Sequence, residues 1–412
     1  MTGSQELLQN RRLLGFGLAT AAFSTLGQTY FLGVYRAPIR EEFGLSDGGF
    51  GLLYLAVTLG SALGINLLGH LIDRYSLRAY TLVEVAVLGG AALLLSATDS
   101  LPGLLLLLLV VRLMGQGMMM HTAMTSMSRY FSKARGMAVA VASLGLPLGQ
   151  AVMPPLAVWL MMSLSWRQSW TVLALGFLVI GPLLVFWLLR GHDRRHTDWA
   201  HRQAAADRDT TTLRPRQWTR RDVLRDPRFY LIMPALVAMP FWVTAVFFFA
   251  ESYASAKGLT MQVFTALYWT HALGAAVVPF LCGALVDRFG GRRLIWLFPP
   301  LLALALLVGI EAASVAGVTA FLALVGIAGG MTIPISNAIW PELYGTRHLG
   351  SIKALFNSVG VLASAMSPLL IGLALDAGVG FVDLLWLGVL HGLVAVPLVL
   401  PVVRGRGIGR AR

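Results

Sequence analysis

The chain is dominated by twelve long apolar runs separated by short polar breaks. A helix of about 20 apolar residues is long enough to cross the hydrocarbon core of a bilayer. Only 12% of the residues are charged, whereas soluble domains carry roughly 25%. We therefore expect an all-α membrane protein with twelve transmembrane helices, near residues 13–35, 48–70, 79–98, 101–125, 136–161, 169–190, 229–253, 261–283, 294–313, 315–340, 350–374 and 382–403.

The sequence also repeats itself with a constant offset of 214 residues, which relates Asp73 to Asp287. One register kept across many glycine, proline and charged positions indicates a duplication. Because each half holds an even number of spans, the halves are expected to be parallel repeats. We expect four parts, namely a six-helix half at 1–190, a cytoplasmic linker at 191–228, a second six-helix half at 229–403 and a basic cytoplasmic tail at 404–412.

The basic residues are distributed unevenly between the two sides of the predicted membrane. The net charge is +13, but these residues lie in short loops between apolar runs, so a nucleic-acid partner is not expected. The N-terminus, the even-numbered loops and the C-terminus hold 27 Lys and Arg residues, and the odd-numbered loops hold four. The positive-inside rule then places both termini and the linker in the cytoplasm. We expect a multi-pass protein of the bacterial inner membrane.

The linker is rich in Arg and Asp and has little hydrophobic pattern. Such a composition favours partial disorder. Its last part, residues 220–228, is a candidate for a short amphipathic helix at the membrane surface. The basic tail is expected to be solvated.

Two motifs point to a known family. The repeated loop lies at residues 69–78 and 283–293, and both copies resemble the signature Gly-x-x-x-Asp-Arg-x-Gly-Arg-Lys/Arg. In the first copy Ser76 and Leu77 replace the usual Gly and Arg, and in the second copy Gly291 replaces a basic residue. In the fourth span, Arg112-Leu-Met-Gly-Gln-Gly approximates the pattern Arg-x-x-x-Gly-x-Gly and is one residue shorter. On these motifs the chain resembles the major facilitator superfamily over almost its whole length. The resemblance implies a secondary transporter that works by alternating access between its halves.

The loop into the fifth span carries a more specific likeness. Tyr130-Phe-Ser-Lys-Ala-Arg135 resembles the Tyr-Phe-x-Lys-Arg-Arg signature of monocarboxylate and oxalate:formate-type carriers. The chain departs from those carriers because its first span has no internal charge and its eighth span offers only His271. It also departs from proton-driven drug exporters, since Gly145-Leu-Pro-Leu-Gly149 lacks their adjacent Gly-Pro.

The resemblance implies that the duplicated loops form a cytoplasmic gate, and the alternative is a solvated loop that only fixes the topology. Asp73 is expected to pair with Arg74 or Arg78, or to lie against the positive N-terminus of the span that starts near residue 350. Asp287 has the equivalent option near residue 136. The full set of gate candidates is Asp73, Arg74, Arg78, Lys133, Arg135, Asp287, Arg288, Arg292, Glu342 and Arg347.

Arg112 is the outstanding single residue because it lies near the middle of the fourth span. An intramembrane arginine is costly and is therefore a functional candidate. Gln116 follows one turn later on the same face. A fixed cation in an apolar cavity attracts a substrate carboxylate. The alternative is a structural role, in which Arg112 pairs with Glu84 or with backbone carbonyls.

Three groups are candidates for proton coupling: His271, His121 and Glu84. Histidine titrates near physiological pH, although a lone intramembrane histidine is often a packing residue, and Glu84 also has structural pairing as its alternative. The remaining substrate-binding candidates are polar or aromatic residues that could instead join helices. They are Gln28, Tyr30, Trp242, Tyr268, His271 and Asn337.

Enzyme, metal and ATP-binding motifs are missing, so catalysis, a metal site and a cofactor are not expected. We expect a monomer in the lipid bilayer that moves a small-molecule substrate. The substrate is expected to be an organic anion such as a monocarboxylate, carried by proton coupling or exchange. One alternative keeps the fold and exports amphipathic or toxic compounds. A second is a transporter-like sensor that moves no solute.

Overall fold

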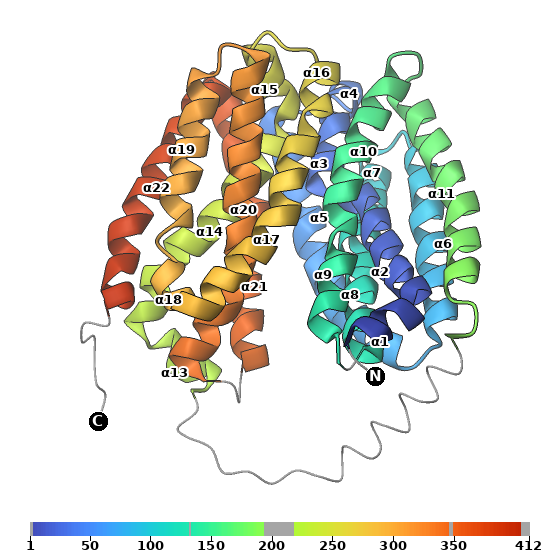
Figure 1. Ribbon diagram of the computed structural model, residues 1–412. Coiled ribbons are helices and arrows are strands. Elements are labelled where there is room, and N and C mark those ends of the chain that lie inside the picture. The colour runs from blue at the N-terminus through green and yellow to red at the C-terminus, as the bar shows by residue number, and fades with distance from the viewer. Residues whose placement is uncertain (1–2, 132, 193–217, 346–348, 405–412) are drawn as a thin grey trace. The chain divides into compact units, whose positions relative to one another are not determined.

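The computed structural model describes residues 3–131, 133–192, 218–345 and 349–404, and the regular elements in these ranges are all helices. The chain divides into two compact units. Unit 1 comprises Met1–Ile39 and Ala56–Leu213, and unit 2 comprises Arg40–Leu55 and Arg214–Arg412. Within each unit, long helices run side by side along a common direction (Figure 1).

The helices before the linker follow the chain in this order: α1 (Gly3–Gln9), α2 (Arg11–Phe23), η1 (Ser24–Gly27), α3 (Thr29–Leu32), η2 (Gly33–Tyr35), α4 (Arg36–Glu42), α5 (Asp47–Leu68), η3 (Gly69–Asp73), α6 (Leu77–Leu95), α7 (Leu101–Arg112), η4 (Leu113–Met119), α8 (Met120–Tyr130), α9 (Arg135–Ser143), α10 (Gly145–Met161) and α11 (Trp166–Leu188). After the linker come α13 (Arg220–Leu224), α14 (Pro227–Phe248), α15 (Ala250–Ala256), α16 (Met261–Ala266), α17 (Tyr268–Phe289), α18 (Gly291–Leu294), α19 (Phe298–Glu311), α20 (Val315–Tyr344), α21 (Leu349–Asp376) and α22 (Phe381–Arg404).

Eleven stretches of the described residues are long and apolar enough to cross a bilayer. They coincide with the second to twelfth predicted spans. The first predicted span is also helical, but it is broken into short pieces from α2 to α4, so it does not form one long helix. The prediction of an all-α protein with twelve transmembrane segments is confirmed.

Hydroxyl side chains determine where several spans begin. Ser76, Ser100 and Ser314 each accept a hydrogen bond from a backbone N–H in the first turn of the helix that follows. Ser165 forms a reciprocal capping box with Gln168 at the start of α11. These bonds satisfy N–H groups that would otherwise lack a partner at a helix start.

The internal duplication reappears in the packing of each unit. In unit 1, α6 packs against α11, and in unit 2, α19 packs against α22. Adding the 214-residue offset to α6 and α11 gives the ranges of α18–α19 and α22 to within two residues. The two units therefore use the same helix pair at the same place in their sequences.

Some predicted boundaries differ from the structure. The seventh span is predicted to reach residue 253, but α14 ends at Phe248 because the chain leaves helical geometry at Phe249. The expected amphipathic helix at 220–228 is shorter, because Asp226 caps the next helix, α14. The predictions for the linker at 193–217 and for the tail at 405–412 lie outside the described residues.

Candidate functional site

The first span of unit 1 breaks where it meets the fourth. The chain passes from α2 into the 3₁₀ turn η1, and Gln28 then adopts an extended conformation before α3 begins. Gly27 lies so close to the fourth span that a Cβ there would be 2.6 Å from the Gln116 nitrogen and from the Val111 carbonyl oxygen. Gly115 faces Gly27 in the same way. The two glycines therefore allow the backbones to approach.

Arg112 points into this break. Its side chain is buried, with 1% exposed, and its Nη1 donates to the Gly27 carbonyl and to the Thr29 hydroxyl, both at 3.4 Å. Both acceptors belong to the interrupted part of the first span. The broken helix thus exposes a backbone carbonyl that a continuous helix would use internally, and the guanidinium binds it. Two structural partners are predicted for Arg112. The backbone carbonyl is confirmed, whereas Glu84 hydrogen-bonds to Thr122 instead.

The fourth span changes its winding directly after Arg112. Residues Leu113–Met119 form the π-helical segment η4, and Gln116 lies within it. Such π-bulges insert an extra residue into the helix and are frequent at functional sites. Gln116 is half-buried and its backbone nitrogen approaches Gly27, so it remains a substrate-binding candidate beside Arg112.

Gln28 and Tyr30 flank the break but have partners of their own. The Gln28 amide nitrogen donates to the Ser24 hydroxyl at 3.3 Å. The Tyr30 hydroxyl lies 3.0 Å from the Thr25 hydroxyl and donates to the Leu146 carbonyl of α10 at 3.4 Å. Tyr30 therefore binds the first span to the fifth.

Glu84 is buried in α6, with 2% exposed. Its Oε1 accepts a hydrogen bond of 2.8 Å from the Thr122 hydroxyl of α8, and its Oε2 has no hydrogen-bond partner among the described residues. His121, the neighbour of Thr122, places its Nε2 3.2 Å from the Gly69 carbonyl. The start of α8 therefore contacts α6 through the Thr122–Glu84 hydrogen bond and contacts the repeated loop through His121.

The candidates in unit 2 do not form one cluster. The Trp242 indole donates to His391 Nδ1 of α22 at 3.2 Å, and His391 Nε2 lies 2.9 Å from the Pro234 carbonyl. Trp242 thus joins α14 to α22. Asn337 is also engaged, since its Oδ1 accepts from Lys353 Nζ at 3.0 Å.

Tyr268 and His271 lie one turn apart on α17 and pack on the same ring. Their rings contact Phe247 of α14 at centroid distances of 4.9 and 4.8 Å. The Tyr268 hydroxyl is buried without a hydrogen-bond partner among the described residues. These two remain adjacent candidates within unit 2.

The first gate loop is held differently from the prediction. Asp73 pairs with Arg129 of α8 rather than with Arg74 or Arg78, and Arg129 also donates to the Ile72 carbonyl at 3.1 Å. Arg78 instead donates to the Leu189 carbonyl at 2.9 Å. The predicted local pairing is wrong because the 3₁₀ turn η3 brings Asp73 beside the end of α8.

A second carboxylate occupies the start of the fifth span. Glu6 of α1 accepts hydrogen bonds from the Lys133 and Ala134 backbone nitrogens at 3.0 and 2.8 Å, just before α9. This is the helix end for which the sequence predicts Asp287. Glu6 is not among the gate residues predicted from the sequence, although an acid in a short amphipathic stretch at the N-terminus is the signal that could have identified it. The Lys133 and Arg135 side chains are exposed.

The second gate loop is capped by Glu342. Its carboxylate accepts from the Gly291 and Arg292 backbone nitrogens at 2.7 and 2.9 Å. Arg292 donates through Nε to the Val402 carbonyl at 2.6 Å. Asp287 and Arg288 are exposed at the end of α17, and the Arg288 guanidinium lies 5.1 Å from the Phe289 ring centroid. Arg347 lies outside the described residues.

Comparison with known proteins agrees with this architecture. The family model described as the Major Facilitator Superfamily matches residues 17–368. The agnestins efflux protein AgnL12 of Paecilomyces divaricatus is 22% identical over 377 residues, covering 88% of this chain and 82% of that protein. The probable nitrate/nitrite antiporter NarK1 of Thermus thermophilus is 27% identical over 299 residues, covering 70% of this chain and 64% of that protein.

Solved transporter structures share the fold. A bacterial homologue of the human lysosomal transporter Spinster, in an inward-facing and occupied conformation, has a TM-score of 0.70 at 15% identity and covers 95% of this chain and 96% of that one. The nucleoside transporter NupG has a TM-score of 0.70 at 11% identity and covers 95% of this chain and 99% of that one. The chain belongs to the Major Facilitator Superfamily, whose members carry small molecules across membranes and are not enzymes.

Proposed function

We propose that this transporter carries a small anion and that Arg112, with the break in the first span, forms the centre of its binding site. The observation that carries the proposal is the buried guanidinium beside interrupted backbone in a membrane span. A buried charge in a span is expensive and usually functional. Irregular backbone at membrane depth is tolerated where it lines a cavity or is buried in protein.

The nature of the anion follows from the chemistry of Arg112. A guanidinium presents planar paired donors that match a carboxylate or a nitrate group. The relative named as a nitrate/nitrite antiporter supports an anionic substrate, and the loop Tyr130–Arg135 favours a monocarboxylate. Proton coupling through His271, His121 or Glu84, or exchange against a second anion, would drive accumulation.

The distribution of basic residues supports a cytoplasmic location for both termini in a bacterial inner membrane. The proposal keeps two six-helix halves, at 1–190 and 229–403, joined by the linker at 191–228. We take the working unit to be a monomer. The gate function of Asp73 and Asp287 belongs to the same proposal.

A second candidate function is export of an amphipathic or toxic compound. The match to the agnestins efflux protein favours it, because that match covers 88% of this chain. In this case Arg112 has a purely structural role and binds the Gly27 carbonyl to hold the first span in place.

Solute counterflow in proteoliposomes distinguishes the two functions. Vesicles loaded with unlabelled formate, lactate, oxalate or nitrate are diluted into the labelled solute, with and without a pH gradient. The anion proposal predicts transient uptake of at least one of these anions. Uptake of a cationic dye without uptake of any anion would establish the exporter instead, and absence of all flux would favour a sensor.

A further inference from the structure

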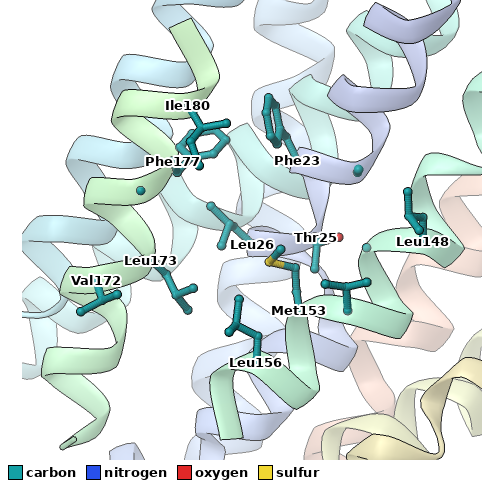
Figure 2. Close-up of a pocket in the computed structure, with 14 residues that line it drawn as sticks. Phe23, Thr25, Leu26, Leu148, Met153, Leu156, Val172, Leu173, Phe177 and Ile180 are labelled. Atoms are coloured by element: carbon teal, nitrogen blue, oxygen red, sulfur yellow. The ribbon is translucent and has the colours of Figure 1, made fainter. Parts of the chain in front are cut away.

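Unit 1 contains an apolar groove outside the Arg112 site. The groove has a volume of about 480 Å³ and lies between α2 with η1, α10 and α11 (Figure 2). Phe23 and Leu26 enter it from the first span, Met153 from α10 and Phe177 from α11. Gly176 of α11 also lines the groove, and a Cβ added there would meet nothing within 4 Å.

The groove opens onto an exposed apolar surface of unit 1. On α11, Val172 and Ile180 at the groove are 47% and 53% exposed, and Leu183 beyond it is 65% exposed. All three are apolar, and α11 is a predicted membrane span. Exposed apolar side chains on a spanning helix have the bilayer as their solvent.

The depth of the groove matches the interior of the bilayer. At 1.5 Å per residue, Val172 lies about 9 Å from the first residue of α11 and Ile180 about 21 Å from it. These depths fall inside a hydrocarbon core of about 30 Å. A lipid headgroup or water would meet no suitable surroundings at this level, so only an apolar chain fits.

The lining offers no polar group that calls for a polar ligand. Its single hydroxyl belongs to Thr25 and is already hydrogen-bonded to Tyr30 at 3.0 Å. A volume of about 480 Å³ is larger than that of about ten water-sized groups. A long hydrocarbon chain has a volume on this scale. An empty cavity of this size would leave its walls without contacts, which is unfavourable.

We propose that this groove is a binding site for one acyl chain of a bilayer phospholipid. The chain enters from the side, between α10 and α11, and packs against Leu26 and Phe177. Leu26 directly precedes Gly27, which accepts the hydrogen bond from Arg112. The bound acyl chain therefore packs on the outer side of the same break in the first span.

Photolabelling with a phospholipid tests this site. The full chain is reconstituted in phosphatidylcholine vesicles whose lipid carries a diazirine midway along one acyl chain, and adducts are mapped by mass spectrometry. We expect adducts on Leu26 and Phe177, which line the groove and are only 5% and 7% exposed. Adducts confined to exposed positions such as Leu183 would overturn the proposal.

A filling variant supplies the matched comparison. Gly176→Leu places a side chain in the groove and should abolish the Leu26 and Phe177 adducts while those on Leu183 persist. Gly90→Leu on α6 is the control, since a Cβ there also meets nothing within 4 Å but does not line the groove. Gly176→Val replaces the leucine variant if that one does not fold. Unchanged adducts in both Gly176 variants, or their removal by excess formate, lactate, oxalate or nitrate, would contradict a lipid site.

Discussion

At the scale of single residues, the hydrogen-bond acceptors of Arg112 are the Gly27 carbonyl and the Thr29 hydroxyl, which could not be predicted from the sequence. The sequence identifies Arg112 because a charge interrupts an apolar run. It does not identify the acceptors, because one is a backbone carbonyl and is freed only by a break in the first span. Gly27 lies at the break, but residues 13–35 contain no proline and no charged residue that would predict a break there. The Gly27 carbonyl is therefore recognised as an acceptor only in the structure.

Glu84 gives a prediction about coupling at the same scale. Its carboxyl is buried and uses one oxygen to accept from Thr122, while Oε2 has no hydrogen-bond partner among the described residues. If this group carries the coupled proton, Glu84→Gln should lose accumulation driven by a pH gradient and retain counterflow. Uptake by proteoliposomes in the two modes measures this.

The control for that experiment is Thr122→Val, which removes the hydrogen bond and keeps the carboxyl. It should lower stability by about 1–3 kcal/mol and preserve gradient-driven accumulation. Accumulation that survives in Glu84→Gln would assign Glu84 a structural role only.

At the scale of helices, the close approach of the first and fourth spans depends on two glycines. A Cβ at Gly115 would lie 2.6 Å from the Gly27 nitrogen, which cannot move without shifting the backbone. Gly115→Ala should therefore destabilise the protein by about 1–3 kcal/mol and displace the acceptors of Arg112. Thermal unfolding of the purified protein measures the loss.

Gly90→Ala is the matched control, since a Cβ at Gly90 meets nothing within 4 Å. It should be neutral or slightly stabilising because alanine favours helix. Equal melting temperatures for the two variants would mean that the approach of the two spans is looser than the structure indicates.

A cap supplied by a distant helix holds the start of α5 within unit 2. The Asp376 carboxylate accepts from the Asp47 and Gly48 nitrogens at 2.9 and 2.8 Å. An acid at a helix N-terminus is favourable, but this one is exposed and solvent weakens the interaction. Asp376→Ala should cost about 0.5–1 kcal/mol and speed hydrogen exchange at residues 47–49. Asp99→Ala, which removes another exposed acid, should leave exchange there unchanged.

At the scale of the whole molecule, the duplication and the apolar runs were sufficient to predict the architecture. The offset of 214 residues relates the packed pair α6 and α11 to the packed pair α19 and α22, so the sequence repeat predicts which helices pack together. The placement of the gate acids was not predictable in the same way. Glu6 accepts hydrogen bonds at the helix start for which the sequence predicts Asp287, and Arg129 pairs with Asp73 where the sequence predicts Arg74 or Arg78. These partners come from distant parts of the chain, so only the fold brings them together.

Topology is predicted at this scale from the charge distribution. In a Cys282→Ser background, Lys257→Cys should react in intact cells with a maleimide that cannot cross the membrane. Arg190→Cys should react only after the membrane is permeabilised, because its loop is predicted to be cytoplasmic. The reverse pattern of labelling would invert the orientation.

Arg112 is proposed to bind the transported anion. The direct measurement is anion counterflow by wild type, Arg112→Gln and Arg112→Lys at matched reconstitution and matched melting temperature. Loss of a charged hydrogen bond worth about 1.5–3 kcal/mol predicts at least a tenfold weaker apparent affinity in Arg112→Gln, with partial recovery in Arg112→Lys. Folded Arg112→Gln protein that transports the anion with unchanged affinity would contradict anion binding by Arg112.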